Sequence, residues 1–252
     1  MDTTRFAGLT AIVTGAGSGI GRATALRIAA EGGRVIVSDL VPDRVTETVT
    51  IITDAGGTAV GVPGDVTDQG HIDALAAACD GSVDVLVNNA GIMDGFLPTG
   101  EMDDATWDRV ISVNLTAQMK TIRAVLPMMT AAGRGSIVNV SSEAGMKGGA
   151  SGTAYAVSKH GVIGLTRSTS VLYSGSGIRC NAVLPGGVAT NIGETSAPKS
   201  EFAWSVLSPL MGAIPGAAQP EQLAAAICWL ASPDAANVTG ALLHSDGGWS
   251  AI

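Results

Sequence analysis

The sequence predicts a single α/β domain, in which helices flank both faces of a doubly wound parallel sheet of about seven strands. Three observations carry this prediction. Short apolar, β-rich runs alternate along the chain with longer helical patterns. The apolar runs are continuous rather than alternating, as is typical of strands buried on both faces. No internal repeat, charge run or linker divides residues 1–252.

Seven strands are expected along the chain. They are LTAIVTG (9–15), RVIVSD (34–39), TAVGV (58–62), VDVLVNNAG (83–91), GSIVNVSS (135–142), IRCNAVLPG (178–186) and GALLHSDGG (240–248). Helices are expected between them, near 19–31, 43–55, 68–80, 103–131, 153–173 and 220–231. Since crossovers between parallel strands are right-handed, this alternation builds one sheet covered by helices.

Residues 190–216 interrupt the alternation and are expected to form a substrate lid. The segment TNIGETSAPKSEFAWSVLSPLMGAIPG separates a strand from a helix, and long insertions in compact domains are usually functional. Two interpretations of its apolar side chains stay open. They wall a substrate pocket, or they pack against the body of the domain or another subunit. The side chains concerned are Phe202, Trp204, Leu207 and Met211.

Composition excludes several classes of protein. Hydrophobic residues make up 46% and charged residues 14% of the chain, which indicates a compact fold. The net charge of −8 argues against nucleic acid as a partner, and more weakly against an acidic carrier protein. No apolar stretch reaches the ~20 residues of a membrane span, and no signal peptide is visible. The three scattered cysteines favour a reducing, cytoplasmic location, and the cysteines and histidines lack metal-ligand spacing, so no metal is expected.

Four glycines mark the turn between the first strand and the first helix. Gly15, Gly17, Gly19 and Gly21 lie in TGAGSGIG (14–21). Glycine allows a tight turn there and lets backbone N–H groups approach a pyrophosphate, to which the helix N-terminus adds its positive dipole end. The position between a strand and a helix favours a dinucleotide site over an ordinary turn.

Asp39 ends the second strand, about twenty residues beyond these glycines. A carboxylate there can accept hydrogen bonds from both adenosine ribose hydroxyls and repels a 2′-phosphate, which predicts NAD over NADP. Ser18 leaves the glycine loop without a base, and Arg22 falls inside the following helix. The alternative is a capping or turn residue before Pro42. Two later loops, with Asp65 and Val66 in GDVTD and with NNAG (88–91), come after strands at the same expected sheet edge, although such segments are also ordinary turns.

Tyr155 and Lys159 are four residues apart and share one face of the expected helix. A neighbouring ammonium favours the phenolate and lowers the tyrosine pKa, giving a group that exchanges a proton with an alcohol or a carbonyl near neutral pH. Ser142 ends a strand at the sheet's carboxyl edge, where its hydroxyl can hold the substrate oxygen. Alone, the pair could be a solvated helix face, and Ser141 and Ser142 simple turn residues.

Taken together, these motifs make the sequence resemble the short-chain dehydrogenase/reductase family, in its single-domain branch of about 250 residues with a Rossmann-like fold. The resemblance covers essentially the whole chain. The matching motifs are TGAGSGIG (14–21), DV (65–66), NNAG (88–91), the asparagine of SVNL (112–115), the serine of VSS (140–142), YAVSK (155–159), PGGVAT (185–190) and DGG (246–248). All occur in the family's order and spacing.

The resemblance implies a role for each site residue. Tyr155 is the general acid/base, Ser142 polarises the substrate oxygen, and Lys159 lowers the tyrosine pKa and binds the nicotinamide ribose. Asn114, a poor helix former in mid-helix, stabilises a water that links the lysine to solvent. The implied cofactor contacts are Gly15, Gly17, Ser18, Gly19, Ile20, Gly21, Asp39, Asp65, Val66, Asn88, Ala90, Gly91, Tyr155, Lys159, Pro185, Gly186, Val188 and Thr190.

Three functions are compatible with the sequence. The first is an NAD(H)-dependent oxidoreductase that interconverts a secondary alcohol and a ketone, apolar and possibly cyclic. Its pocket is walled by residues 93–97 and 146–151 and by the lid. The second is an NADPH-dependent 3-oxoacyl-(acyl carrier protein) reductase, against which Asp39 and the negative charge both count. The third is a non-catalytic nucleotide-binding scaffold, which the retained Tyr155 and Lys159 disfavour. The resemblance also implies a homotetramer built from the helices that carry Asn114 and Tyr155 and from the C-terminal strand.

Overall fold

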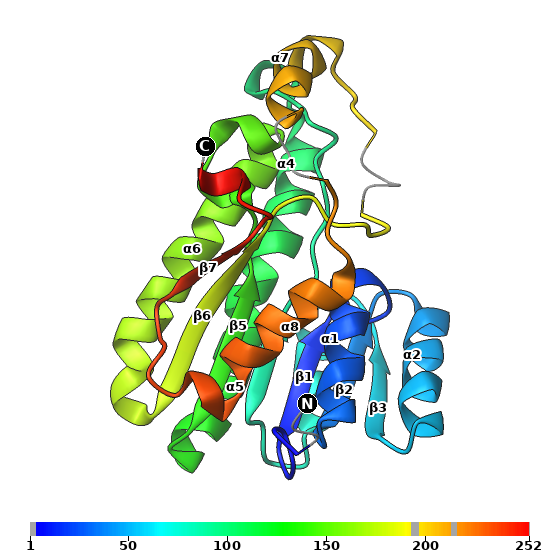
Figure 1. The fold of residues 1–252 in the computed structure, drawn as a ribbon, viewed down its shortest axis with the longest axis vertical. Coiled ribbons are helices and arrows are strands. Elements are labelled where there is room, and N and C mark those ends of the chain that lie inside the picture. The colour runs from blue at the N-terminus through cyan, green and yellow to red at the C-terminus, as the bar shows by residue number, and fades with distance from the viewer. Residues whose placement is uncertain (1–3, 193–196, 213–215, 252) are drawn as a thin grey trace.

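A computed structural model describes residues 4–192, 197–212 and 216–251, and it confirms the predicted α/β fold (Figure 1). All strand pairs in the sheet are parallel, in the order β3-β2-β1-β4-β5-β6-β7. The strands are β1 (Thr10–Thr14), β2 (Arg34–Asp39), β3 (Thr58–Pro63), β4 (Val85–Asn88), β5 (Gly135–Val140), β6 (Ile178–Pro185) and β7 (Leu242–Ser245).

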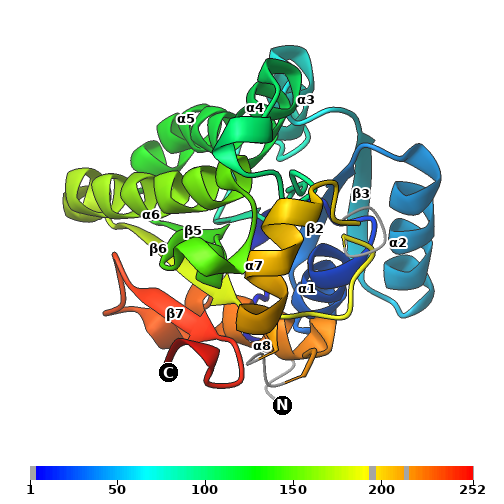
Figure 2. The same ribbon diagram turned by 90° about the horizontal axis from the view of Figure 1, so that it is seen from above.

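Helices cover both faces of this sheet (Figures 1 and 2). They connect parallel strands as the right-handed crossover rule requires. One face carries α1 (Gly19–Ala30), α2 (Pro42–Asp54) and α8 (Pro220–Ala231). The other carries α3 (Gln69–Ala77), α4 (Asp104–Ile111), α5 (Ala117–Ala132) and α6 (Thr153–Tyr173).

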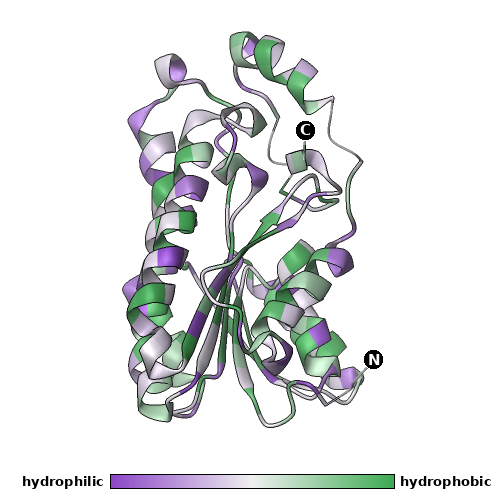
Figure 3. Ribbon diagram, turned by 60° about the vertical axis from the view of Figure 1, so that its left-hand side comes forward, coloured by the Kyte–Doolittle hydropathy of each residue, from purple (hydrophilic) through white to green (hydrophobic). Residues whose placement is uncertain are grey.

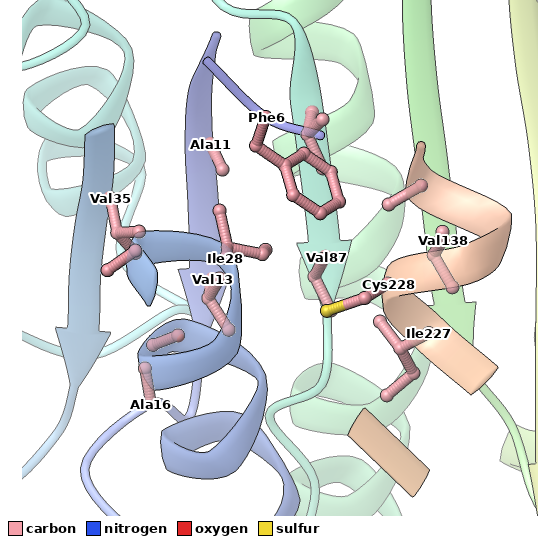
Figure 4. Packing of buried hydrophobic residues seen from close by; sticks show 14 of the residues in the cluster. Phe6, Ala11, Val13, Ala16, Ile28, Val35, Val87, Val138, Ile227 and Cys228 are labelled. Atoms are coloured by element: carbon pink, nitrogen blue, oxygen red, sulfur yellow. The ribbon is translucent and has the colours of Figure 1, made fainter. Parts of the chain in front are cut away.

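The central strands bury side chains on both faces, because successive residues of a strand point to opposite sides. In β1, Ala11 and Val13 pack with Ile28 of α1 and Ile227 of α8 (Figure 4). Ile12, between them, joins the second core on the opposite face, where α3 and α5 pack. Two hydrophobic cores separated by one sheet therefore hold the domain together.

The outer strands depart from the expectation of burial on both faces. In β3, Thr58, Gly61 and Pro63 are exposed, and none of its six residues is fully buried. β7 likewise has no fully buried residue. Both strands lie at an edge of the sheet, where helices cover them incompletely.

One long helix expected over 103–131 is divided. A π-helical turn, Ser112–Thr116, joins α4 to α5. Such a turn adds one residue to the helical repeat and is frequently found at functional sites. Here it contains Asn114, the residue for which the sequence predicted a role.

The expected lid contains a helix that the sequence did not predict, α7 (Glu201–Met211), largely hydrophobic and at the top of the molecule in Figure 3. Ser200 caps it, since its hydroxyl accepts the Ala203 N–H at 3.0 Å. Leu207 and Ala203 pack against Phe96 in a small separate cluster. The parts of the lid at 193–196 and 213–215 lie outside the described residues.

In the part of the chain that the structure describes, no helix is both long enough and apolar enough to cross a bilayer. The three cysteines are buried free thiols.

Candidate active site

A cavity of about 920 Å³ opens at the carboxyl ends of the strands. It spans the point between β1 and β4 where the strand order reverses, which is the position at which open α/β sheets bind ligands. Loops after β1 to β6 all contribute residues to its wall. The topology thus gathers distant segments of the chain into one place.

The glycine loop after β1 is fixed by Asn89. Its Nδ2 donates to the carbonyl oxygens of Thr14 at 3.0 Å and Gly15 at 3.2 Å. The Thr14 hydroxyl in turn accepts the N–H groups of Asn89 and Ala90 at 3.0 and 3.1 Å. Gly15 has a φ of +62°, and a side chain at Gly21 would overlap the Gly15 carbonyl. The loop and the start of α1 therefore require glycine at these two positions.

Asp39 lines the cavity beside this loop. One carboxylate oxygen accepts the Gly17 N–H at 3.0 Å, and the other accepts the Val41 N–H at 3.1 Å. A Cβ at Gly17 would lie 2.7 Å from the carboxylate. The carboxylate is therefore held at the end of β2, where the sequence predicted a ribose contact.

One basic residue near Asp39 in the cavity was not predicted from the sequence. Arg44 of α2 is exposed and lines the cavity near Asp39. Arg22, which the sequence analysis considered, instead forms a two-bonded ion pair with Glu47 at 2.6 and 3.1 Å. The end of the cavity near Asp39 thus carries both an acid and a base.

The start of α1 can accept an anion. Its N-cap Ser18 makes no side-chain cap hydrogen bond, and Ser18, Gly19 and Ile20 line the cavity, so this helix end offers backbone N–H groups without a capping side-chain oxygen. Thr190 lies across the loop, its methyl carbon 3.0 Å from where a Gly19 Cβ would be. The donors and the absence of side-chain bulk fit a dinucleotide pyrophosphate.

Three candidate catalytic side chains meet at the other end of the cavity. Tyr155 and Lys159 come from α6, with the Lys159 Nζ 5.4 Å from the centre of the tyrosine ring. Ser142, two residues beyond β5, lies close enough to Tyr155 for its side chain to lower the tyrosine pKa. The Lys159 Nζ also donates to the Val140 carbonyl at 2.9 Å, which anchors α6 to β5.

Burial controls the proton affinities of this group. It raises the pKa of Tyr155 to about 12, against the lowering effect of the Ser142 side chain. It lowers the pKa of Lys159 to about 8, because the ammonium is removed from water. Desolvation is the largest effect, so Tyr155 holds its proton at neutral pH. The lowering of the tyrosine pKa by Lys159 stays a prediction.

Asn114 lies behind the cavity wall. Its amide accepts the Ile92 N–H at 2.8 Å and donates to the Ile92 carbonyl at 2.9 Å. A further hydrogen bond reaches the Ser158 hydroxyl at 3.2 Å. The π-helical turn thus ties the segment after β4 to α6, next to Lys159.

Asp94 is a buried carboxylate that the sequence analysis did not identify. One oxygen accepts the Tyr155 N–H at 2.9 Å, and the other accepts the Phe96 N–H at 3.0 Å. A Cβ at Gly152 would lie 2.5 Å from both oxygens. Asp94 therefore caps the start of α6, where its negative charge interacts favourably with the helix dipole. The same charge raises the pKa of Tyr155.

The family of the chain follows from its match to known proteins. A family model described as short chain dehydrogenase matches residues 9–201. The chain belongs to the short-chain dehydrogenase family. It is accordingly an oxidoreductase that acts on CH–OH groups and binds a nicotinamide dinucleotide.

Three relatives illustrate the range of this family. The chain is 44% identical over 250 residues to cis-4-hydroxycyclohexanecarboxylate dehydrogenase of Sinomonas cyclohexanicum, covering 98% of both chains. It matches the crystal structure of levodione reductase with a TM-score of 0.90 at 32% identity, over 98% of this chain and all of that one. A Beutenbergia cavernae protein, assigned as an NAD(P)-dependent gluconate 5-dehydrogenase, has bound NADP at low occupancy. It matches with a TM-score of 0.87 at 38% identity over the full length of both chains.

Most of the predicted site residues of this short-chain dehydrogenase line the cavity. The exceptions are Gly17, Gly21, Asn88 and Asn114, which lie behind its surface. The Asn88 side chain is buried, bonding Asn139 at 3.0 Å and Thr121 at 2.7 Å, and its neighbour Asn89 lines the cavity instead. Those that line it are Gly15, Ser18, Gly19, Ile20, Asp39, Asp65, Val66, Ala90, Gly91, Ser142, Tyr155, Lys159, Pro185, Gly186, Val188 and Thr190.

The expected apolar substrate wall is only partly present. Met93 and Gly95 line the cavity, together with Lys199 from the segment before α7. Met146 and Phe202 are exposed, and neither lines the cavity. Leu207, Met211 and Trp204 instead pack around Phe96. Leu207 and Met211 therefore pack against the body of the domain, whereas Phe202 does not.

We predict that Asp94→Asn destabilises the protein by about 1–3 kcal/mol, because the amide's NH₂ would face a backbone N–H and leave buried donors unsatisfied. Urea unfolding followed by circular dichroism measures this change. Asp108→Asn, on the exposed side of α4, is the control and is expected to stay within about 0.5 kcal/mol of the native protein. Equal stability of both variants would show that Asp94 does not support α6.

Proposed function

We propose that the protein is an NAD(H)-dependent oxidoreductase that interconverts a secondary alcohol and a ketone, with Tyr155 as general acid/base. The observation that carries this proposal is the convergence of Tyr155, Ser142 and Lys159 in the cavity that also contains the glycine loop. The bound nicotinamide supplies or accepts the hydride. The protein's own groups position the substrate oxygen and move its proton.

The protonation states define how these residues act. Tyr155 holds its proton at neutral pH, so it can donate to the oxygen of a ketone as that oxygen gains negative charge. The side chain of Ser142 lies close to the tyrosine and is placed to bond the same oxygen. Lys159 is mostly charged below pH values of about 8 and stabilises the phenolate that the donation leaves. Alcohol oxidation uses the same path in reverse.

The cofactor is proposed to be NAD. A carboxylate at the end of β2 suits two ribose hydroxyls and repels a 2′-phosphate, and Asp39 is held there by the Gly17 N–H. Two observations favour NADP instead: Arg44 in the cavity wall and the relative with bound NADP. The NADPH-dependent acyl carrier reductase therefore stays the alternative enzyme. The non-catalytic scaffold is the alternative of another class.

The substrate is proposed to be apolar and cyclic. Support comes from Met93, Ile92 and Ile192 in the cavity wall and from the relative named for a hydroxycyclohexanecarboxylate. A 4-hydroxycyclohexanecarboxylate has a cyclohexane ring with a secondary hydroxyl group and a carboxylate. Lys199, in the wall of the same cavity, is a cationic side chain that could face such a carboxylate.

A homotetramer in the cytoplasm is proposed as the working state. The exposed apolar residues Val171 and Leu172 lie on α6, the helix expected at the subunit contact, and are 77% and 72% exposed in the single chain. Met119 adds an exposed apolar side chain on α5. The free thiols fit a reducing compartment.

Tyr155→Phe should lower kcat by about 10²- to 10⁴-fold, because the proton donor is lost while the ring still fills its space. Stopped-flow turnover on cyclic alcohols with NAD⁺ measures the rate, and fluorescence energy transfer from tryptophan to NADH checks that cofactor binding persists. Tyr173→Phe changes the other tyrosine and should keep full activity. Full turnover by Tyr155→Phe would eliminate the proposed mechanism.

NADH should bind at least about tenfold more tightly than NADPH, a difference of about 1.4 kcal/mol, because Asp39 repels the extra phosphate. Titration by fluorescence energy transfer gives both constants. Asp39→Ala should reduce the preference, while Asp43→Asn, a nearby exposed acid on α2, should retain it. Tighter NADPH binding by the native protein would move the 3-oxoacyl-(acyl carrier protein) reductase to first place, and no binding of either nucleotide would contradict both enzymatic functions.

Sedimentation velocity should show one species of four chains. Replacing both Val171 and Leu172 with glutamate should produce smaller species, since like charges would meet in a desolvated contact. Ile51→Glu introduces the same charge on α2, away from the proposed contact, and should leave the mass unchanged. A native monomer would contradict the proposal.

A further inference from the structure

Glu143 is the most unusual buried group outside the proposed active site. It comes directly after Ser142, in the turn Glu143–Gly145, and its side chain is 0% exposed. Its Oε1 lies 2.5 Å from His244 Nδ1. Its other oxygen, Oε2, is buried without a hydrogen-bond partner among the described residues. A buried carboxylate oxygen without a partner costs free energy, so it requires an explanation.

Two further donors approach the same point. His244 comes from β7 and Asp246 from the turn after it. The donor atoms of Glu143, His244 and Asp246 all lie within 4.8 Å of one another. This is the one cluster of metal-ligating side chains found among the described residues. Sequence spacing could not indicate it, because about a hundred residues separate Glu143 from the other two.

We propose that Glu143, His244 and Asp246 bind a divalent transition-metal ion, with Zn²⁺ as the representative. Two carboxylates and one imidazole supply three protein ligands, and solvent can complete the coordination. The ion supplies the missing partner of Glu143 Oε2 and neutralises two negative charges that otherwise lie together. This proposal does not depend on the proposed enzymatic function.

The geometry of the cluster fits such an ion. Bonds of about 2.1 Å to one zinc place ligand atoms roughly 3–4 Å apart, so small side-chain rotations suffice here. Asp246 is already oriented, since its oxygens accept the N–H groups of Gly248 at 3.0 Å and Ser250 at 2.6 Å. Such supporting hydrogen bonds are typical of metal ligands. The His244 side chain is 35% exposed, which gives the ion a path from solvent.

The imidazole coordinates a metal ion in its neutral form and the carboxylates as anions, and no electron is transferred. Affinity is therefore expected to fall as the solution becomes acidic. Mg²⁺ should bind less well, because it has little preference for imidazole and loses its water shell reluctantly.

Isothermal titration of the chelator-treated full chain with Zn²⁺ tests the proposal. One ion per chain is expected. His244→Asn should weaken Zn²⁺ binding by at least about tenfold. A loss of about tenfold in affinity is typical even when the changed residue only hydrogen-bonds to a metal ligand. Asp246→Asn is a second ligand variant. His160→Asn, an exposed histidine on α6, is the matched control and should bind as the native protein does.

Thermal unfolding gives a readout independent of any enzymatic activity. Zn²⁺ should raise the Tm of the native protein and of His160→Asn, because binding stabilises the folded state. It should not raise the Tm of the ligand variants. Absence of binding to the native protein overturns the proposal, and so does equal affinity in His244→Asn with the fold intact by circular dichroism.

Discussion

The arrangement of the site depends on the close contact between the glycine loop and the loop after β4. Asn89 and Thr14 join the ends of β1 and β4 through four hydrogen bonds at the point where the strand order reverses. Gly15 and Gly21 permit the approach because no side chain would fit. If these loops moved apart, the turn at the start of α1 would lose its fixed position, and the anion site with it.

A second constraint acts at the other end of the cavity. Asp94, Asn114 and the Lys159 ammonium all bond backbone groups, so α6 is fastened to the segment after β4 and to β5. These bonds hold Tyr155 beside Ser142 and bury it at the same time. The burial that fixes the tyrosine also raises its pKa, so position and proton affinity have one physical cause.

Features that depend on hydrophobic periodicity, or on glycine in a tight turn, could be predicted from the sequence. Continuous apolar runs identified the strands, and the glycines before a helix identified the tight turn after β1. Features that tertiary contacts decide could not be predicted. The helix α7 exists because Phe96 and Leu207 pack together across about a hundred residues. Asp94, Arg44 and the Glu143–His244 pair have no local signature, since their partners come from distant segments. The desolvation that raises the pKa of Tyr155 could not be predicted either, because a sequence shows the neighbouring ammonium but not the depth of burial.

The order of the strands also has a consequence for synthesis of the chain. β1, β2 and β3 are neighbours in the sheet and in the sequence, so they can pair as soon as about sixty residues have emerged. β4 must then join β1 on its other side, and β5 and β6 extend that half. The side of the cavity near Asp39 is therefore synthesised early, whereas the wall formed by residues 185–192 is synthesised more than a hundred residues later. A stalled ribosome would hold a nascent chain with the glycine loop and Asp39 made, but with no wall opposite them.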